Sequence, residues 1–134
     1  MQKMHPILSK FFLSVMFFFV QNPVKMTSLE VSIVSLAQNV TTVEGDEVVL
    51  RCSVHNMGAH QQIIWRRGFE VIAAGAVLLK IDFRYSVVLG PGSSQLNIQS
   101  VALEDGGEYV CQVQTDQGMK EVKHQVIVQG ETES

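Results

Sequence analysis

The feature that most constrains the fold of this 134-residue chain is a single pair of cysteines, Cys52 and Cys111, which lie 59 positions apart. They form no C-x-x-C motif, and the few histidines do not complete a zinc-finger spacing with them. In a chain that enters the secretory pathway, such a pair predicts one disulfide rather than two free thiols. Closing a loop of about 60 residues would stabilise the fold by roughly 4 kcal/mol in the chain-entropy model.

Both cysteines lie in short segments in which inward and outward positions alternate. In 47–54, every second residue from Val48 to Val54 falls on one side of the chain, and Cys52 is among them. This period of two predicts half-buried strands, and turn residues separate the segments. The other expected strands are 62–66, 96–99, 109–114 and 122–128, with turns at 44–46, 90–93 and 116–118. The pattern indicates an all-β sandwich or barrel.

The positions of two aromatic residues narrow this choice. Trp65 follows Cys52 by 13 residues, Tyr109 precedes Cys111 by two, and 105–111 fits D-x-G-x-Y-x-C. These features resemble the immunoglobulin superfamily, in which a tryptophan packs on an inter-sheet disulfide and a buried tyrosine hydroxyl bonds a nearby backbone group. We therefore expect an immunoglobulin-like two-sheet sandwich of I or V type, with Trp65 and Tyr109 in its core.

Composition divides the chain into a leader and a domain. Thirteen of the first twenty residues are Met, Ile, Leu, Val or Phe, and Lys3 and Lys10 precede the apolar run 11–20. Ten apolar residues are too few to span a bilayer, which requires about 20, so a cleaved secretory signal is favoured over a signal anchor. We expect a signal peptide at 1–28, an immunoglobulin-like domain at 29–130 and a polar tail at 131–134. The cleavage site stays open between 27–28 and 35–37, and no other run is long enough to span a membrane.

Beyond these general features, the chain resembles the first immunoglobulin domain of IgLON and lachesin-type neural adhesion proteins. The resemblance covers about 38–129 and depends on the segments 43–46, 64–67, 74–75, 81–84, 111–116 and 126–129. It implies that Arg84 forms an ion pair with Asp105. An exposed arginine would contribute only about 0–1 kcal/mol through such a pair. Family members have two or three such domains and a membrane anchor, which this chain of one domain is not expected to have.

Strand alternation also predicts which side chains leave the core in the sheet that holds strands C, F and G in this fold. An apolar centre with a polar rim is typical of an interaction surface, and the resemblance implies that first domains dimerise through this face. Scattered exposed aliphatic residues are the alternative. The expected partner-binding residues are Ile64, Arg66, Val110, Gln112, Gln114 and Ile127. Val71 and Ile72 would extend the surface, but their orientation cannot be read from the pattern.

One glycosylation sequon is present, Asn39-Val40-Thr41. In a secreted chain, Asn39 is a plausible acceptor for an N-linked sugar. Because Asn39 lies near the start of the domain, a sugar there is expected to spare the C–F–G face.

Charge and motifs favour binding over catalysis. The net charge of −3 argues against a nucleic-acid partner, and neither H-E-x-x-H nor G-x-S-x-G occurs. We expect no enzyme activity, metal, cofactor or small-molecule substrate. The expected function is an extracellular adhesion or recognition module that binds other immunoglobulin domains, homophilically or heterophilically. The alternative is a secreted soluble ligand or decoy for membrane-bound relatives. Either version places the protein outside the cell, with attachment to the cell surface left open.

Overall fold

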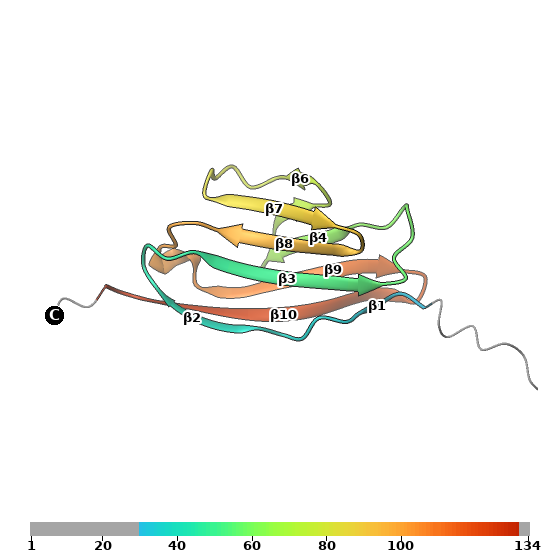
Figure 1. The fold of residues 1–134 in the computed structure, drawn as a ribbon, viewed down its shortest axis with the longest axis horizontal. Coiled ribbons are helices and arrows are strands. Elements are labelled where there is room, and N and C mark those ends of the chain that lie inside the picture. Colours follow the sequence, from blue (N-terminus) through green and yellow to red (C-terminus); the bar gives the residue numbers. More distant parts are fainter. Residues whose placement is uncertain (1–29, 132–134) are drawn as a thin grey trace, which may run out of the picture.

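The computed structural model describes residues 30–131, so the expected signal peptide lies outside the described residues. Within that range the chain folds into two packed β-sheets (Figure 1). This arrangement confirms the all-β, two-sheet sandwich expected from the sequence.

The four-stranded sheet has the order β1-β3-β8-β7. Its strands are β1 (Ser32–Ile33), β3 (Val48–His55), β7 (Tyr85–Gly90) and β8 (Ser93–Ile98), and all neighbours are antiparallel. The turn between β7 and β8 depends on Gly92, which has a φ of 62°. A Cβ at Gly92 would lie 2.8 Å from the Val54 carbonyl oxygen, so this close approach to β3 requires glycine.

The six-stranded sheet has the order β2-β10-β9-β4-β5-β6. Its strands are β2 (Asn39–Val43), β4 (Ile63–Arg67), β5 (Glu70–Ala74), β6 (Val77–Leu78), β9 (Gly107–Thr115) and β10 (Gly118–Gln129). β2 runs parallel to β10, and the other pairs are antiparallel. In immunoglobulin terms β4, β9 and β10 are strands C, F and G, and β5 and β6 add the two strands that distinguish variable-type domains.

The core lies between the sheets, where the alternating inward residues of both meet. Cys52 and Cys111 form a disulfide with 6.3 Å between their Cα atoms, and both are fully buried. Trp65 is also fully buried, and its indole N–H donates to the Ser94 hydroxyl at 2.8 Å, which joins β4 to β8 across the sandwich. These contacts place the expected core residues where alternation predicts.

Candidate functional site

The candidate site is the outward surface of the six-stranded sheet, here called the six-stranded outer face. Alternation holds along β4, where Ile63 and Trp65 are buried while Ile64 and Arg66 are partly exposed on the opposite side. The same alternation continues along β10, where Ile127 is 57% exposed between buried or partly buried neighbours. The outward residues of this face include Ile64, Arg66, Val71, Val77, Gln112, Gln114, Met119, Glu121, Lys123, Gln125 and Ile127.

Arg66 connects three strands at the centre of this face. Its Nε donates to Gln112 Oε1 at 2.8 Å, and its Nη2 lies 3.1 Å from Glu121 Oε2. Lys123 adds a longer ion pair to Glu121, at 3.8 Å. The guanidinium is therefore held in place before any partner arrives, although about a third of each charged side chain in the Arg66–Glu121 pair remains exposed.

The burial of Val110 differs from the expectation that Val110 is one of the exposed partner-binding residues. It points to the outer side and does not belong to the core cluster, yet it is only 1% exposed. β9 is an inner strand, and Val110 lies opposite Arg66 on β4 and Lys123 on β10. Long basic side chains cover apolar neighbours with their aliphatic stems, so Val110 packs beneath Arg66 and Lys123 instead of meeting a partner.

Sequence reasoning named Val71 as an extension of this surface with its orientation left open, and it did not name Val77 or Met119. Val71, Val77 and Met119 are 40%, 59% and 46% exposed. The pairing of β4 with β5 shifts register between Trp65 and Arg66, so alternation alone could not orient Val71. Val71 lies opposite Arg66 and points outward, whereas Ile72 is fully buried.

A recess of about 290 Å³ borders Ile64 at one end of the face. It lies between the β3–β4 loop and the β9–β10 hairpin. Its lining residues are His60, Gln61, Gln62, Ile64, Gln114, Thr115 and Asp116. Gln112 and Gln114 were both expected on this face, and Gln114 contributes to the recess. A recess with an apolar wall and several amide groups can accept a side chain of a docking protein.

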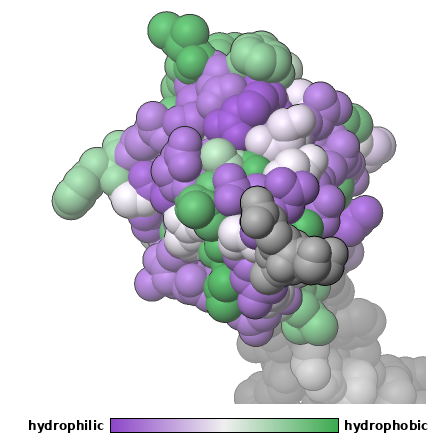
Figure 2. Space-filling view, turned by 90° about the vertical axis from the view of Figure 1, so that its left-hand side faces the viewer, coloured by the Kyte–Doolittle hydropathy of each residue, from purple (hydrophilic) through white to green (hydrophobic). Residues whose placement is uncertain are grey.

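Further exposed apolar side chains lie in two loops beyond the face. Phe69, Ile81 and Phe83 are almost completely exposed, and an ion pair of 3.0 Å joins Lys80 to Glu70, the first residue of β5. Figure 2 views the end of the sandwich where β2 turns into β3, and it shows hydrophobic groups projecting from a mostly hydrophilic surface. The sequence pattern gave no reason to separate these residues from core positions.

The structure also brings together the expected ion-pair residues, Arg84 and Asp105. Arg84 Nη1 lies 2.6 Å from Asp105 Oδ2, and Arg84 Nη2 donates to Asp105 Oδ1 at 3.1 Å. Arg84 also binds Asp82 at 2.9 Å, so it is shared between two carboxylates. Hydrogen bonding to Asp105 first, and then to Asp82, raises the pKa of Arg84.

Asp105 is 3% exposed and organises the end of the sandwich. Burial alone would raise the pKa of Asp105, but hydrogen bonds from Arg84, the Ala102 N–H and the Tyr85 hydroxyl outweigh it and lower the pKa. The Tyr109 hydroxyl donates to the Asp105 carbonyl oxygen at 2.6 Å, as expected for a buried tyrosine before the second cysteine. Burial raises the pKa of both Tyr109 and Tyr85, and the hydrogen bond between them adds to the rise at Tyr85. This cluster holds together the end of the sandwich.

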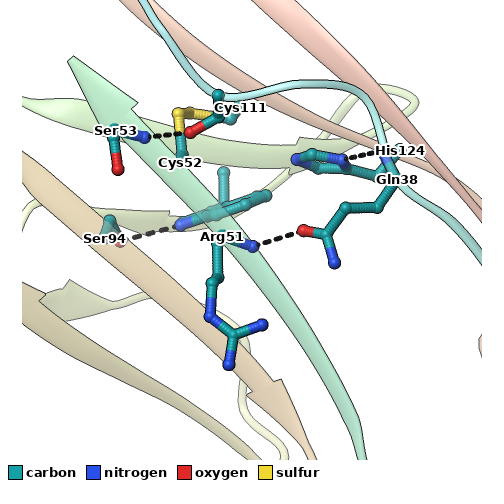
Figure 3. The surroundings of a disulfide bond; sticks show 9 residues. Gln38, Arg51, Cys52, Ser53, Ser94, Cys111 and His124 are labelled. Atoms are coloured by element: carbon teal, nitrogen blue, oxygen red, sulfur yellow. Dashed lines mark hydrogen bonds between the residues drawn. A yellow bond between two sulfur atoms is a disulfide. The ribbon is translucent and has the colours of Figure 1, made fainter.

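His124 lies near the disulfide, with its ring centroid 5.7 Å from that of Trp65 (Figure 3). Its Nδ1 accepts the Gln38 N–H at 2.8 Å, and its buried Nε2 has no hydrogen-bond partner in the described part of the chain. Burial lowers the pKa of His124, and a smaller effect from the Arg51 backbone opposes this. Among residues 30–131, no group of three His, Cys, Asp or Glu side chains is arranged to hold a metal. Within the same range, no helix is long and apolar enough to cross a bilayer.

The immunoglobulin domain family matches residues 32–114. The chain belongs to the immunoglobulin domain family. Limbic system-associated membrane protein of Gallus gallus is 33% identical over 92 residues, which cover 68% of this chain and 27% of that protein. This relative confirms the expected resemblance to IgLON proteins. The chain spans only about a quarter of the length of this curated relative.

Solved structures give the same family. DIP-gamma IG1+IG2 has a TM-score of 0.70 at 29% identity, covering 75% of this chain and 49% of that one. The Ig1 domain of mouse SynCAM 2 has a TM-score of 0.65 at 26% identity, covering 72% and 96%. Dpr1 IG1 bound to DIP-eta IG1 has a TM-score of 0.69, covering 75% and 97%, and at 21% identity it supports the fold alone. These relatives point to a non-enzymatic family.

Proposed function

We propose that this protein is an extracellular recognition module that binds another immunoglobulin domain through its six-stranded outer face. The observation that carries the proposal is the combination of exposed apolar side chains with a preformed charged network. Ile64, Val71 and Met119 lie on the same face as the Arg66–Glu121 ion pair. The function is reversible burial of this surface, without a chemical step.

The arrangement of the face favours a protein partner over a small ligand. Protein interfaces combine an apolar centre with a polar rim, and aromatic or arginine residues often carry most of their energy. Here Arg66 is held by Gln112 and Glu121, so less side-chain entropy is lost when a partner binds. A partner would place a carboxylate or carbonyl near Arg66 and apolar side chains over Ile64.

The comparisons support this proposal without identifying the partner. A structure that matches this chain at 29% identity, with a TM-score of 0.67, is Dpr2 Ig1-Ig2 in complex with DIP-Theta Ig1-Ig3. The curated relative is named a membrane protein of the limbic system. By analogy, we assign this chain an adhesion or recognition role outside the cell, with homophilic and heterophilic binding as two versions of it.

The test is a pair of charge insertions on opposite sheets. Ile64→Glu should weaken self-association or partner binding about tenfold or more, since a buried unpaired charge costs at least about 1.4 kcal/mol at an interface. Val88→Glu is the matched control, because Val88 is 54% exposed on the four-stranded sheet. Sedimentation velocity and partner titration measure association, while intact mass and circular dichroism verify the disulfide and the fold. Equal association of Ile64→Glu and the wild type would contradict the proposal.

Localisation separates adhesion from the soluble alternative. Expressed protein is fractionated between culture medium and membranes after signal processing. Retention on membranes supports an adhesion module, whereas recovery in the medium supports a soluble ligand or decoy that binds through the same face. Cytosolic protein with reduced cysteines would contradict both.

A further inference from the structure

The sequon Asn39-Val40-Thr41 forms the first three residues of β2. Asn39 and Thr41 are exposed, while Val40 between them is partly buried and packs against the core. Among the strands of residues 30–131, β2 lies at the edge of its sheet, so one side of its backbone has no strand neighbour within that range. The acceptor side chain and the hydroxyl residue of the sequon therefore both point away from the core.

The pairing of β2 with β10 shows which surface Asn39 faces. Asn39 lies opposite Gln125, and Thr41 lies opposite Ile127. Gln125 and Ile127 are exposed on either side of the buried Val126, so they belong to the six-stranded outer face. The side chain of Asn39 projects on that same side. This corrects the expectation that a sugar at Asn39 would spare the C–F–G face.

The backbone at this position is bound to both sheets. The Gln38 N–H donates to His124 on β10, and the Gln38 side chain accepts the Arg51 N–H at 2.7 Å on β3 (Figure 3). The Gln125 N–H also donates to the Gln38 carbonyl at 2.9 Å. A sugar attached to the next residue would therefore start from a fixed point.

We propose that Asn39 carries an N-linked glycan, and that this glycan covers the Gln125–Ile127 end of the six-stranded outer face. The partner then docks on the remaining part, around Ile64, Val71 and Met119. This inference rests on the proposed function, because a glycan is added only to a chain that enters the secretory pathway.

Strand geometry explains why the glycan would cover one end of the six-stranded outer face and leave the other end accessible. Ile127 lies one strand and two residues from Asn39, which corresponds to roughly 8 Å between Cα atoms. Ile64 lies three strands away and about four residues further along the sheet, which corresponds to roughly 20 Å. The sugars nearest the protein crowd Ile127 first and leave Ile64 open. They also shield the free edge of β2 from strand pairing.

The first experiment measures occupancy and shielding without any partner. The full chain is secreted from animal cells, and glycopeptide mass spectrometry reports on Asn39. Thr41→Ala removes the sequon while keeping Asn39, and Thr41→Ser keeps the sequon as the matched control. Hydroxyl-radical footprinting then compares Ile127 with Met119. Loss of the glycan should raise the oxidation of Ile127 several-fold and leave that of Met119 unchanged.

The second experiment adds a sugar at a different position on the six-stranded outer face. Gln112→Asn with Gln114→Thr creates a sequon at the centre of the face and should abolish association, whereas the glycan at Asn39 permits it. Gln112→Asn alone, which creates no sequon, is the control for side-chain effects. In the glycosylated protein, Ile127→Glu should change association far less than Ile64→Glu does.

The outcomes distinguish this inference from the function it rests on. Unmodified Asn39 in protein recovered from the medium overturns the glycan while leaving the recognition role intact. Equal oxidation of Ile127 with and without the glycan overturns the shielding. Absence of association in every variant contradicts the proposed function, while the occupancy and footprinting results stand by themselves. Protein that stays in the cytosol overturns the extracellular assignment and the glycan together.

Discussion

The outer faces of the two sheets are built by the same alternation but carry different chemistry. The four-stranded outer face presents mainly small or neutral polar residues, apart from Val49, Val88 and Arg51. Its outward residues include Val49, Arg51, Ser53, Ser86, Val88, Ser93, Gln95 and Asn97. The six-stranded outer face instead carries Ile64, Val71, Val77 and Met119 around the Arg66–Glu121 ion pair.

This difference is not required by the fold. Both sheets bury a similar inward set against the same disulfide and Trp65, so stability can be satisfied with either kind of outward residue. The larger set of exposed apolar side chains around an ion pair on one outer face is therefore better explained by what that face binds than by folding.

The largest effect is expected from the disulfide, on which both faces depend. Cys52→Ala with Cys111→Ala should lower the free energy of unfolding by about 4 kcal/mol, because the loop between them is no longer closed in the unfolded chain. Urea denaturation of the oxidised wild type and the variant measures this. A loss shared by probes on both sheets fits one cooperative core, whereas a loss confined to one sheet would contradict it.

The next effect is expected at the end of the sandwich that both faces share. Arg84→Ala leaves Asp105 buried with an unpaired charge and should cost about 2–3 kcal/mol, less than a fully buried pair because Arg84 is partly exposed. Lys80→Ala is the control, since it breaks the surface pair to Glu70 and should cost less than about 1 kcal/mol. Thermal and urea denaturation give both values, and equal losses would contradict the assigned role of Asp105.

Acid titration checks the same assignment. The pKa of Asp105 is lowered in the folded state, so the unfolded chain takes up its proton first as the pH falls. Stability from this group is present above about pH 4 and is lost below it. In Arg84→Ala the unpaired, buried carboxylate favours protonation, so the difference between wild type and variant should narrow as the pH falls. A constant difference down to pH 3 would exclude the pair as its source.

Sequence predicts the parts of this molecule that local rules determine. The alternation around Cys52, Trp65 and Cys111 is enough to give the sandwich and its disulfide, because each of these residues lies in a regular strand. Alternation places Val110 on the outer side correctly but does not predict its burial, because Arg66 and Lys123 lie opposite it on the neighbouring strands.

The orientations of two other residues, Val71 and Asn39, could be determined only from the pairing of the strands. The orientation of Val71 follows a register shift between Trp65 and Arg66 that no single strand reveals. Asn39 faces the same side as Ile127 only because β2 joins the six-stranded sheet in parallel with β10. Alternation gives the two sides of a strand, but the sheet and register that a strand adopts decide which surface each side forms.

A smaller, pH-dependent effect is expected from His124, which supports the six-stranded sheet from within. Burial lowers the pKa of His124 in the folded state, so the unfolded chain binds the proton more readily. The free energy of unfolding should therefore fall as the pH drops through about 6.5. His124→Gln should flatten this slope between pH 7.5 and pH 5, and His60→Gln, at an exposed position, should preserve it. An unchanged slope in His124→Gln would assign the pH dependence to another group.

The smallest change in stability, and the sharpest separation of the faces, is expected from two matched arginine substitutions. Arg66→Met removes the donors to Gln112 and Glu121 but keeps an apolar stem over Val110, so it should cost less than about 1 kcal/mol of stability. It should still weaken association about tenfold, because arginine is a frequent centre of interface energy. Arg51→Met makes the same change on the four-stranded outer face and should leave association unchanged. If both variants bind like the wild type, the charged network serves the sheet alone; if both bind more weakly, docking is not confined to one face.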